Sequence, residues 1–199
     1  MKERGMIFNA EMVRAILDGR KTQTRRPVKF PLIDKNMGCE LAGNELAGEL
    51  AAHNYWNSPY GKPGDRIWVR ETFRVHSRAT DVATLVYRAS VRNSWTEQTH
   101  RVPVAVCNTP ATPEKWTPSI HMPRWASRIT LEITGVRVER LNSITESDAE
   151  AEGVTDTGFG DLLVDGYRYL WKSIYGEGSW AANPWVWVIE FKRVEGGAA

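Results

Sequence analysis

The pattern of apolar and polar positions predicts strands in the middle of the chain and helices toward its two ends. Residues 65–73, DRIWVRETF, alternate between apolar and polar side chains and are rich in aromatic and β-branched residues, which is typical of a strand. The same reasoning predicts strands over residues 83–90 and 184–194, and one long strand or a bent pair of strands over residues 126–141. Residues 93–118 are rich in threonine and proline and predict a loop.

Two helices are predicted in the C-terminal part of the chain. Thr145 is followed three residues later by Asp148, which resembles a capping box, and Gly153 ends this short helix. Residues 165–176 form a second helical pattern, in which large apolar side chains share one face. These side chains are Tyr167, Leu170, Trp171 and Ile174.

A third helix is predicted near the start of the chain, directly before a cluster of positive charges. Asn9 suits the N-cap of this helix, and Gly19 suits the position that ends it. Pro27 prevents a helix from continuing beyond residue 26, so we expect residues 20–26 to form a loop or a short extended segment. Two threonine hydroxyls lie among the four cations of this segment. The cations are Arg20, Lys21, Arg25 and Arg26.

The length and the order of these elements predict one α+β domain. The chain has 199 residues, which suits a single domain. Strands in the middle with helices at the ends of the sheet segments predict a small β-barrel with peripheral helices. The formal net charge is only +2, but residues 1–30 carry eight cations and three acids, whereas residues 139–165 carry eight acids and one arginine. These two segments can meet in a compact fold or face opposite ways.

The sequence also excludes several classes of site. The two cysteines, Cys39 and Cys107, are far apart and lie in no CxxC motif, and the four histidines form no HxxxH pair. This pattern indicates neither a disulfide framework nor a zinc site. No P-loop or Rossmann glycine motif is present, so we expect no cofactor and no bound metal. No stretch is apolar enough for a signal peptide or a membrane span, so we expect a cytoplasmic protein.

Four segments together resemble the ASCH family, which has a fold like that of the PUA RNA-binding barrel. They are LDGRKTQTRRP, GDRIWVRETF, ITESDAEAEG and NPWVWVIEFKRV, and their order matches the family over most of the chain. The stretch PSIHMPRWASRI is similar to the longer ASCH proteins associated with phages and prophages. The resemblance implies a single PUA-like ASCH domain over residues 1–199, with insertions near residues 31–62 and 90–120.

Small bacterial members of the family include an amidohydrolase that removes the acyl group from N4-acetylcytidine. The resemblance to its motifs implies that Lys21 and Thr24 of the basic segment and Glu152 of the short helix are catalytic. Thr24 is then the nucleophile, Lys21 is its base, and Glu152 relays a proton or holds the lysine. Another member resembles a metal-assisted ribonuclease, and others are thought only to bind RNA, so the resemblance implies no single activity.

Independently of the resemblance, the side chains of these residues are compatible with amidase chemistry. A threonine hydroxyl is a weak nucleophile and needs a base within hydrogen-bond reach, and a lysine is a base only when it is neutral. Burial and the neighbouring arginines lower the pKa of Lys21, whereas a nearby carboxylate such as Glu152 raises it. Because Lys21 and Thr24 lie three positions apart, they meet if the segment turns and face opposite sides if it is a straight strand.

Further side chains are candidates for binding a nucleoside or a nucleic acid, because arginine and tryptophan clamp phosphates and stack on bases. They are Arg20, Arg25, Arg26, Glu71, Arg124, Trp125 and Arg128. The alternatives are a solvated, phosphate-contacting loop for the basic segment and a surface acid for Glu152. Trp125 can instead anchor the start of a core strand, and Glu71 is either a second acid of the site or part of a structural ion pair.

The leading hypothesis is an amidohydrolase that acts on N4-acylcytidine or a related modified base. The first alternative is a module that binds RNA or a modified base without chemistry, and the second is a metal-dependent ribonuclease. The expected partner is a nucleoside, an RNA or a modified DNA, and no membrane.

Overall fold

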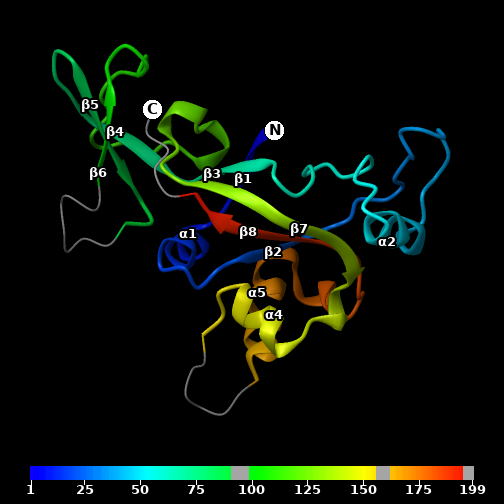
Figure 1. Cartoon of the computed structure of the whole chain (residues 1–199). Coiled ribbons are helices and arrows are strands. Elements are labelled where there is room, and N and C mark those ends of the chain that lie inside the picture. Colours follow the sequence, from blue (N-terminus) through cyan, green and yellow to red (C-terminus); the bar gives the residue numbers. More distant parts are fainter. Residues whose placement is uncertain (91–98, 156–161, 195–199) are drawn as a thin grey trace. The chain divides into compact units, whose positions relative to one another are not determined.

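The computed structural model describes residues 1–90, 99–155 and 162–194 (Figure 1). Within these residues the chain forms eight strands and four α-helices, which confirms the predicted α+β class. Part of the predicted loop, residues 93–98, lies outside the described residues.

The strands form two sheets. The first has the strand order β1-β3-β7-β8-β2, and the second has the order β4-β5-β6. The strands of the first sheet are β1 (Glu3–Ile7), β3 (Arg66–Arg70), β7 (Thr130–Arg140), β8 (Trp185–Arg193) and β2 (Gln23–Pro27). Those of the second are β4 (Phe73–Arg78), β5 (Val82–Tyr87) and β6 (Thr99–Pro103).

The chain divides into two compact units, and the expectation of one domain with insertions stays a prediction. The first unit consists of residues 1–2, 19–65 and 132–192, and the second of residues 3–18, 66–131 and 193–199.

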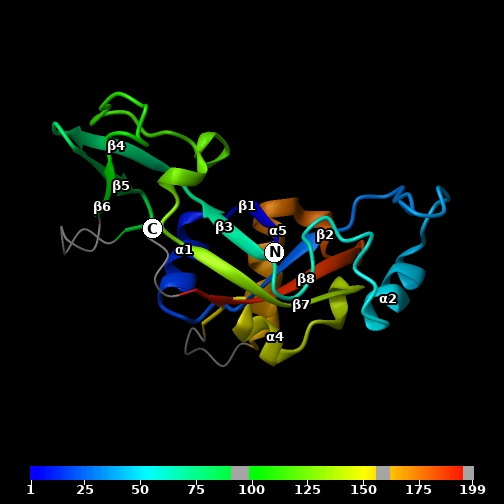
Figure 2. The same ribbon diagram turned by 45° about the horizontal axis from the view of Figure 1, so that its top comes forward.

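In the first unit, two helices lie against β2 and β8. These helices are α4 (Glu146–Ala151) and α5 (Leu163–Tyr175), which lie next to each other (Figure 1 and Figure 2). Tyr167 and Trp171 of α5 pack with Val186 and Val188 of β8 in a buried apolar cluster. β8 runs antiparallel to β2, with Gln23 opposite Glu190 and Pro27 opposite Val186.

The predicted capping signals of α4 are confirmed. The Thr145 hydroxyl accepts a hydrogen bond from the Asp148 main-chain N–H at 3.1 Å, and the Asp148 carboxylate accepts one from the Thr145 N–H at 3.1 Å. Gly153 follows the C-cap residue Glu152 with a φ of 88°, which glycine readily adopts. The predicted apolar face of α5 is wrong at Ile174, which is 43% exposed.

The second unit contains a parallel pair of strands, helix α1 (Ala10–Leu17) and the three-stranded sheet. Strand β1 runs parallel to β3, and helix α1 begins at Asn9, whose side chain accepts a hydrogen bond from the Met12 N–H at 2.8 Å. The sheet of β4, β5 and β6 packs on its own buried cluster, which includes Phe73, Leu85 and Met122.

Two sequence predictions need correction. The basic segment adopts the extended alternative, since residues 23–27 form β2, and the region of the predicted insertion at 31–62 contains helix α2 (Gly43–Ala51). The predicted loop 93–118 contains β6. The predicted strand 65–73 ends at Arg70, and β4 begins at Phe73. β1 was not predicted at all.

Two glycines of α2 provide a test of its packing. A Cβ at Gly43 would overlap the indole of Trp185, whereas one at Gly48 would meet no atom within 4 Å. We therefore expect Gly43→Ala to lower the free energy of unfolding by about 1–3 kcal/mol, because the rigid ring must move. Gly48→Ala should raise it by about 0.5–1 kcal/mol, because alanine favours helix. Urea unfolding measures both, and equal stabilisation by the two substitutions would contradict this packing.

Candidate functional site

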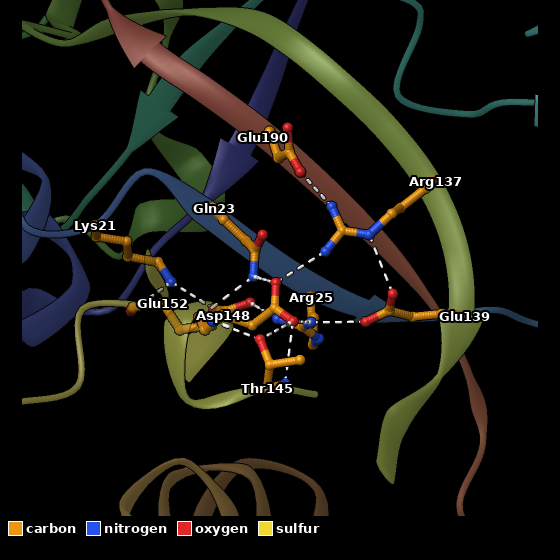
Figure 3. A network of polar contacts seen from close by, with 9 residues as sticks. All are labelled: Lys21, Gln23, Arg25, Arg137, Glu139, Thr145, Asp148, Glu152 and Glu190. Carbon is orange, nitrogen blue, oxygen red and sulfur yellow. Dashed lines mark hydrogen bonds and ion pairs between the residues drawn. The ribbon is translucent and has the colours of Figure 1, made fainter. Parts of the chain in front are cut away.

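The basic segment is held in an extended conformation between α4 and β8. Lys21 forms an isolated antiparallel bridge with Glu152, and the Thr22 N–H donates to the Ala151 carbonyl at 2.8 Å. The Phe191 N–H donates to the Thr22 carbonyl, also at 2.8 Å. Because side chains alternate along extended chain, Lys21, Gln23 and Arg25 share one face, where they reach residues at and near α4 (Figure 3).

Lys21 and Glu152 form a buried ion pair at the start of this face. The Lys21 Nζ donates to the Glu152 Oε2 at 2.7 Å and to the Glu152 main-chain carbonyl at 2.9 Å. The two side chains are 0% and 2% exposed. Burial lowers the pKa of Lys21, and the charges of Arg26 and Arg25 lower it further, although the Glu152 carboxylate opposes them. The neutral form of this amine is therefore populated at a lower pH than in an exposed lysine.

Arg25 shares the same carboxylate and adds two more acids to the cluster. Its Nη1 lies 3.2 Å from the Glu152 Oε1, so each oxygen of this carboxylate contacts a different cation. Its Nη2 lies 2.7 Å from the Glu139 Oε1 and 3.3 Å from the Asp148 Oδ2. The guanidinium is fully buried and is surrounded by three carboxylates.

Arg137 of β7 extends the network toward the surface. It contacts Glu139 at 3.1 Å, Asp148 at 2.9 Å and Glu190 of β8. The Gln23 Nε2 also donates to the Asp148 Oδ1 at 3.2 Å. Burial raises the pKa of Asp148, but hydrogen bonds from Thr145 and the charge of Arg25 outweigh it and lower the pKa to about 2.

These nine residues, shown in Figure 3, are called the β2 network below. They are Lys21, Gln23, Arg25, Arg137, Glu139, Thr145, Asp148, Glu152 and Glu190. Catalytic or binding roles were predicted from the sequence for only three of them, Lys21, Arg25 and Glu152, whereas Thr145 and Asp148 were predicted only as helix-capping residues. The missed members carried a signal, because Gln23 lies two positions from Lys21, and Arg137 lies two positions from Glu139, which is the spacing of one strand face.

Thr24 and Arg26 lie on the other face of β2. Thr24 is opposite Ile189 of β8 and is 2% exposed, and Arg26 is opposite Trp187. The ring of Tyr60 packs edge-on against Trp187 at a centroid distance of 5.9 Å. The turn that would bring Thr24 to Lys21 is therefore not formed, because the segment is extended and pairs with β8.

A cavity of about 550 Å³ is lined by residues that neighbour the buried pair in sequence, but not by Lys21 or Glu152 themselves. Its lining includes Arg20 and Thr22, which flank Lys21 in sequence, and Ala151, which precedes Glu152. The Arg20 Nη1 donates to the Gly153 carbonyl at 3.0 Å, so this exposed arginine is anchored at the end of α4. A second cavity of about 640 Å³ reaches the outer end of the β2 network and is lined by Arg137 and Glu190 together with His53 and Tyr55.

The other proposed binding residues belong to the second unit. The Arg124 Nε contacts the Glu3 carboxylate at 3.0 Å, and Trp125 packs edge-on against Phe73 at a centroid distance of 6.3 Å. Arg128 holds Glu71 through two hydrogen bonds of 2.9 and 3.0 Å. Its guanidinium also lies 4.1 Å from the ring centroid of Tyr87.

These contacts agree with the structural alternatives for Trp125 and Glu71. Trp125 packs against the buried cluster of the second unit, and Glu71, only 2% exposed, is held in an ion pair. Burial raises the pKa of Glu71, although the hydrogen bonds and charge of Arg128 oppose the shift.

The described part of the chain contains neither a cluster of metal-ligating side chains nor a helix that could cross a membrane. In residues 1–90, 99–155 and 162–194, no three histidine, cysteine, aspartate or glutamate side chains come together as a metal site would require. Over the same ranges, no helix has the length and apolar character needed to cross a membrane.

No protein-family model and no curated protein matches the sequence. Among solved structures, the chain is similar to protein EF3133 from Enterococcus faecalis V583, described by the family model DUF984, with a TM-score of 0.42 and 11% identity. That match covers 98% of this chain and 81% of the other. The chain is also similar to an ASCH domain from Lactobacillus crispatus JV V101, with a TM-score of 0.42 and 12% identity over 96% of this chain and 79% of the other.

Removing the shared carboxylate tests the energetics of the buried pair. Glu152→Gln leaves Lys21 and Arg25 buried without their common anion, so we expect the free energy of unfolding to fall by about 3–5 kcal/mol. The matched control is Glu132→Gln, which breaks the more exposed pair with Lys192 at 3.0 Å and should cost about 0–1 kcal/mol. Urea unfolding compares the two variants. Equal losses would show that the buried pair is no more important than the surface pair.

Proposed function

We propose that the protein is an amidohydrolase that removes the acyl group from N4-acylcytidine or a related modified base, with Lys21 and Glu152 as its proton-transfer pair. The observation that carries this proposal is the 2.7 Å contact between two buried side chains, one of which is a lysine with a lowered pKa. A lysine in this state can act as a general base at a lower pH than an ordinary exposed lysine.

In the proposed reaction, Lys21 takes up one proton and later returns it, while Glu152 holds the lysine. The neutral amine of Lys21 takes the proton of an attacking hydroxyl while the oxygen forms a bond to the acyl carbon. The bond between that carbon and N4 then breaks, and the ammonium returns the proton to N4, which leaves as the free amine of cytosine. Glu152 holds the Lys21 Nζ in place and stabilises the ammonium while it carries the proton.

Two nucleophiles remain to be tested in this scheme. A water molecule releases the acid directly, whereas a threonine hydroxyl forms an ester that a second water must hydrolyse, which frees the acid and restores the hydroxyl. Thr24 is implied by the resemblance to the ASCH amidohydrolase, but its side chain leaves β2 on the face opposite to Lys21. A water molecule is the other candidate. Thr24→Val removes the hydroxyl with little change of volume. Lost hydrolysis and a missing acyl-enzyme mass in this variant would identify Thr24, whereas retained hydrolysis would identify water.

A binding module without chemistry is the second candidate function. It is favoured by the surroundings of Lys21, because its Nζ is fully buried and already donates hydrogen bonds to a carboxylate and a carbonyl. In this case the network stabilises the fold, and the adjoining cavities bind a nucleoside or an RNA. Incubation with N4-acetylcytidine and with single-stranded RNA, each with and without Mn²⁺, distinguishes three functions. Release of cytidine indicates the amidohydrolase, cleavage of RNA only with Mn²⁺ indicates a metal-dependent ribonuclease, and binding without either product indicates a binding module.

Substitution of Lys21 by arginine tests whether its amine must lose a proton. Arginine keeps the positive charge but stays protonated, so Lys21→Arg should abolish the conversion of N4-acetylcytidine to cytidine, measured by chromatography. Lys35→Arg, at an exposed lysine, is the matched control and should leave the rate unchanged. In the wild-type protein the rate should rise with pH, because deprotonation activates the base, with a midpoint below the usual lysine value of 10.5.

Two outcomes would overturn the assignment. If a folded Lys21→Arg protein hydrolyses the substrate at the wild-type rate, Lys21 is not the base. If the wild-type protein hydrolyses no N4-acylcytidine at any pH tested, the amidohydrolase proposal is lost and the binding function remains.

A further inference from the structure

The β1 and β3 pair in the second unit has one buried and one accessible face. Met6, Ile67 and Val69 point to the buried face and are each at most 8% exposed. The alternate positions point the other way and are exposed or half-buried. On the accessible side they are Glu3, Gly5, Ile7, Arg66, Trp68 and Arg70.

Trp68 lies across the neighbouring strand, where Gly5 makes room for it. Gly5 is the register partner of Trp68, and a Cβ at Gly5 would lie 2.6 Å from the Cζ2 atom of the indole. Any other residue at this position would therefore push the ring away. The ring extends sideways over the exposed Gly5.

Arginines flank this ring along the same strand. The Arg70 guanidinium lies 5.3 Å from the ring centroid of Trp68 and donates a hydrogen bond through Nη2 to the Ile120 carbonyl, which leaves its other N–H groups for a phosphate. Arg66 lies two residues before Trp68 on the same face. A second pair of the same kind follows in the chain, where the Arg74 guanidinium lies 4.6 Å from the ring centroid of Trp116. Alternating cations and flat rings are typical of surfaces that bind phosphates and bases together.

The charge of the second unit is complementary to a polyanion. Its sequence contains 13 lysines and arginines and eight acids, whereas that of the first unit contains 13 lysines and arginines and 16 acids. The acid on the accessible face, Glu3, is paired with Arg124 at 3.0 Å, and this hydrogen bond lowers the pKa of Glu3. The nearby acid Glu71 is paired with Arg128. Both carboxylates are thereby neutralised by arginines.

We propose that this face, defined by Gly5, Ile7, Arg66, Trp68 and Arg70 and called the Trp68 face, binds single-stranded nucleic acid. One base stacks on the indole of Trp68, and Arg66 and Arg70 contact the flanking phosphates. A single strand is the fitting ligand, because its bases are free to stack, whereas those of a duplex are covered by their neighbours. The Trp68 face belongs to the second unit, so its proposed role does not depend on hydrolysis by the first.

Fluorescence anisotropy of the full chain with a labelled 12-nucleotide oligouridine tests the proposal. Trp68→Ala should weaken binding about 10-fold, because one base loses its stacking partner. Trp56→Ala is the matched control, since Trp56 is 65% exposed but belongs to the first unit, and it should bind as the wild type does. Arg66→Gln should reduce the slope of log affinity against log salt by about 0.7, the value for one phosphate contact on a single strand.

Two further variants separate stacking from folding. Trp68→Phe keeps a flat ring and should retain most of the affinity, whereas Gly5→Ala leaves Trp68 intact but displaces its ring and should weaken binding. Circular dichroism checks that each variant is folded. The same measurements with a DNA strand of matching length and sequence show whether the face binds only RNA or single-stranded nucleic acid of either kind. The probe carries no acyl group, so the result is independent of the amidohydrolase assignment.

Three results would overturn the proposal. They are wild-type affinity in folded Trp68→Ala and Gly5→Ala proteins, an equal loss in the Trp56→Ala control, and tighter binding of a duplex than of a single strand.

Discussion

The contact between Lys21 and Glu152 determines how the first unit is built around its candidate site. It joins the start of the segment that becomes β2 to the residue that follows α4, more than one hundred positions later in the chain. Two opposite charges removed from water are tolerated only when their remaining hydrogen-bonding groups are also satisfied. The Glu152 carbonyl and Arg25 meet that requirement, since the carbonyl accepts a second bond from Lys21 and Arg25 occupies the other carboxylate oxygen.

The same requirement explains the rest of the β2 network. Once Arg25 is buried beside Glu152, its second nitrogen needs anions, and Glu139 and Asp148 supply them. These two acids in turn contact Arg137, which reaches Glu190 at the more exposed end. The result is a chain of alternating charges that runs from a fully buried amine to the surface. Its four carboxylates outnumber its three cations, which favours the charged form of all three cations. Burial opposes this at Lys21, and because the pKa of a lysine is lower than that of an arginine, the lysine is the cation that can give up a proton.

The sequence was most informative where a local signal and the tertiary structure agree. The capping residues Thr145 and Asp148 define α4, and the apolar alternation defines β8, so both elements were predicted. The resemblance to ASCH motifs also pointed to Lys21 and Glu152, which the structure brings together.

Strand pairing between segments distant in sequence decides what the sequence left open about β2. Residues 23–27 are charged and end in proline, but β8 supplies the strand against which they pair, and this places Thr24 on the far side from Lys21. The contacts of Arg137 with Asp148 and Glu190 likewise depend on the register of β7 and β8, and only its spacing from Glu139 is visible locally. Helix α2 was missed for a local reason, because its two glycines hide the helical spacing of Leu46 and Leu50.

The most direct test of this account is the protonation equilibrium of the Lys21 amine in the folded protein. It can be followed by nitrogen NMR of lysine side chains, with the Lys21 signal assigned from its loss in the Lys21→Arg spectrum. The account predicts a pKa below the ordinary lysine value of 10.5, because burial and the neighbouring arginines outweigh the attraction of Glu152. A pKa at or above 10.5 would contradict it, since Lys21 would then be a permanently charged member of a structural ion network.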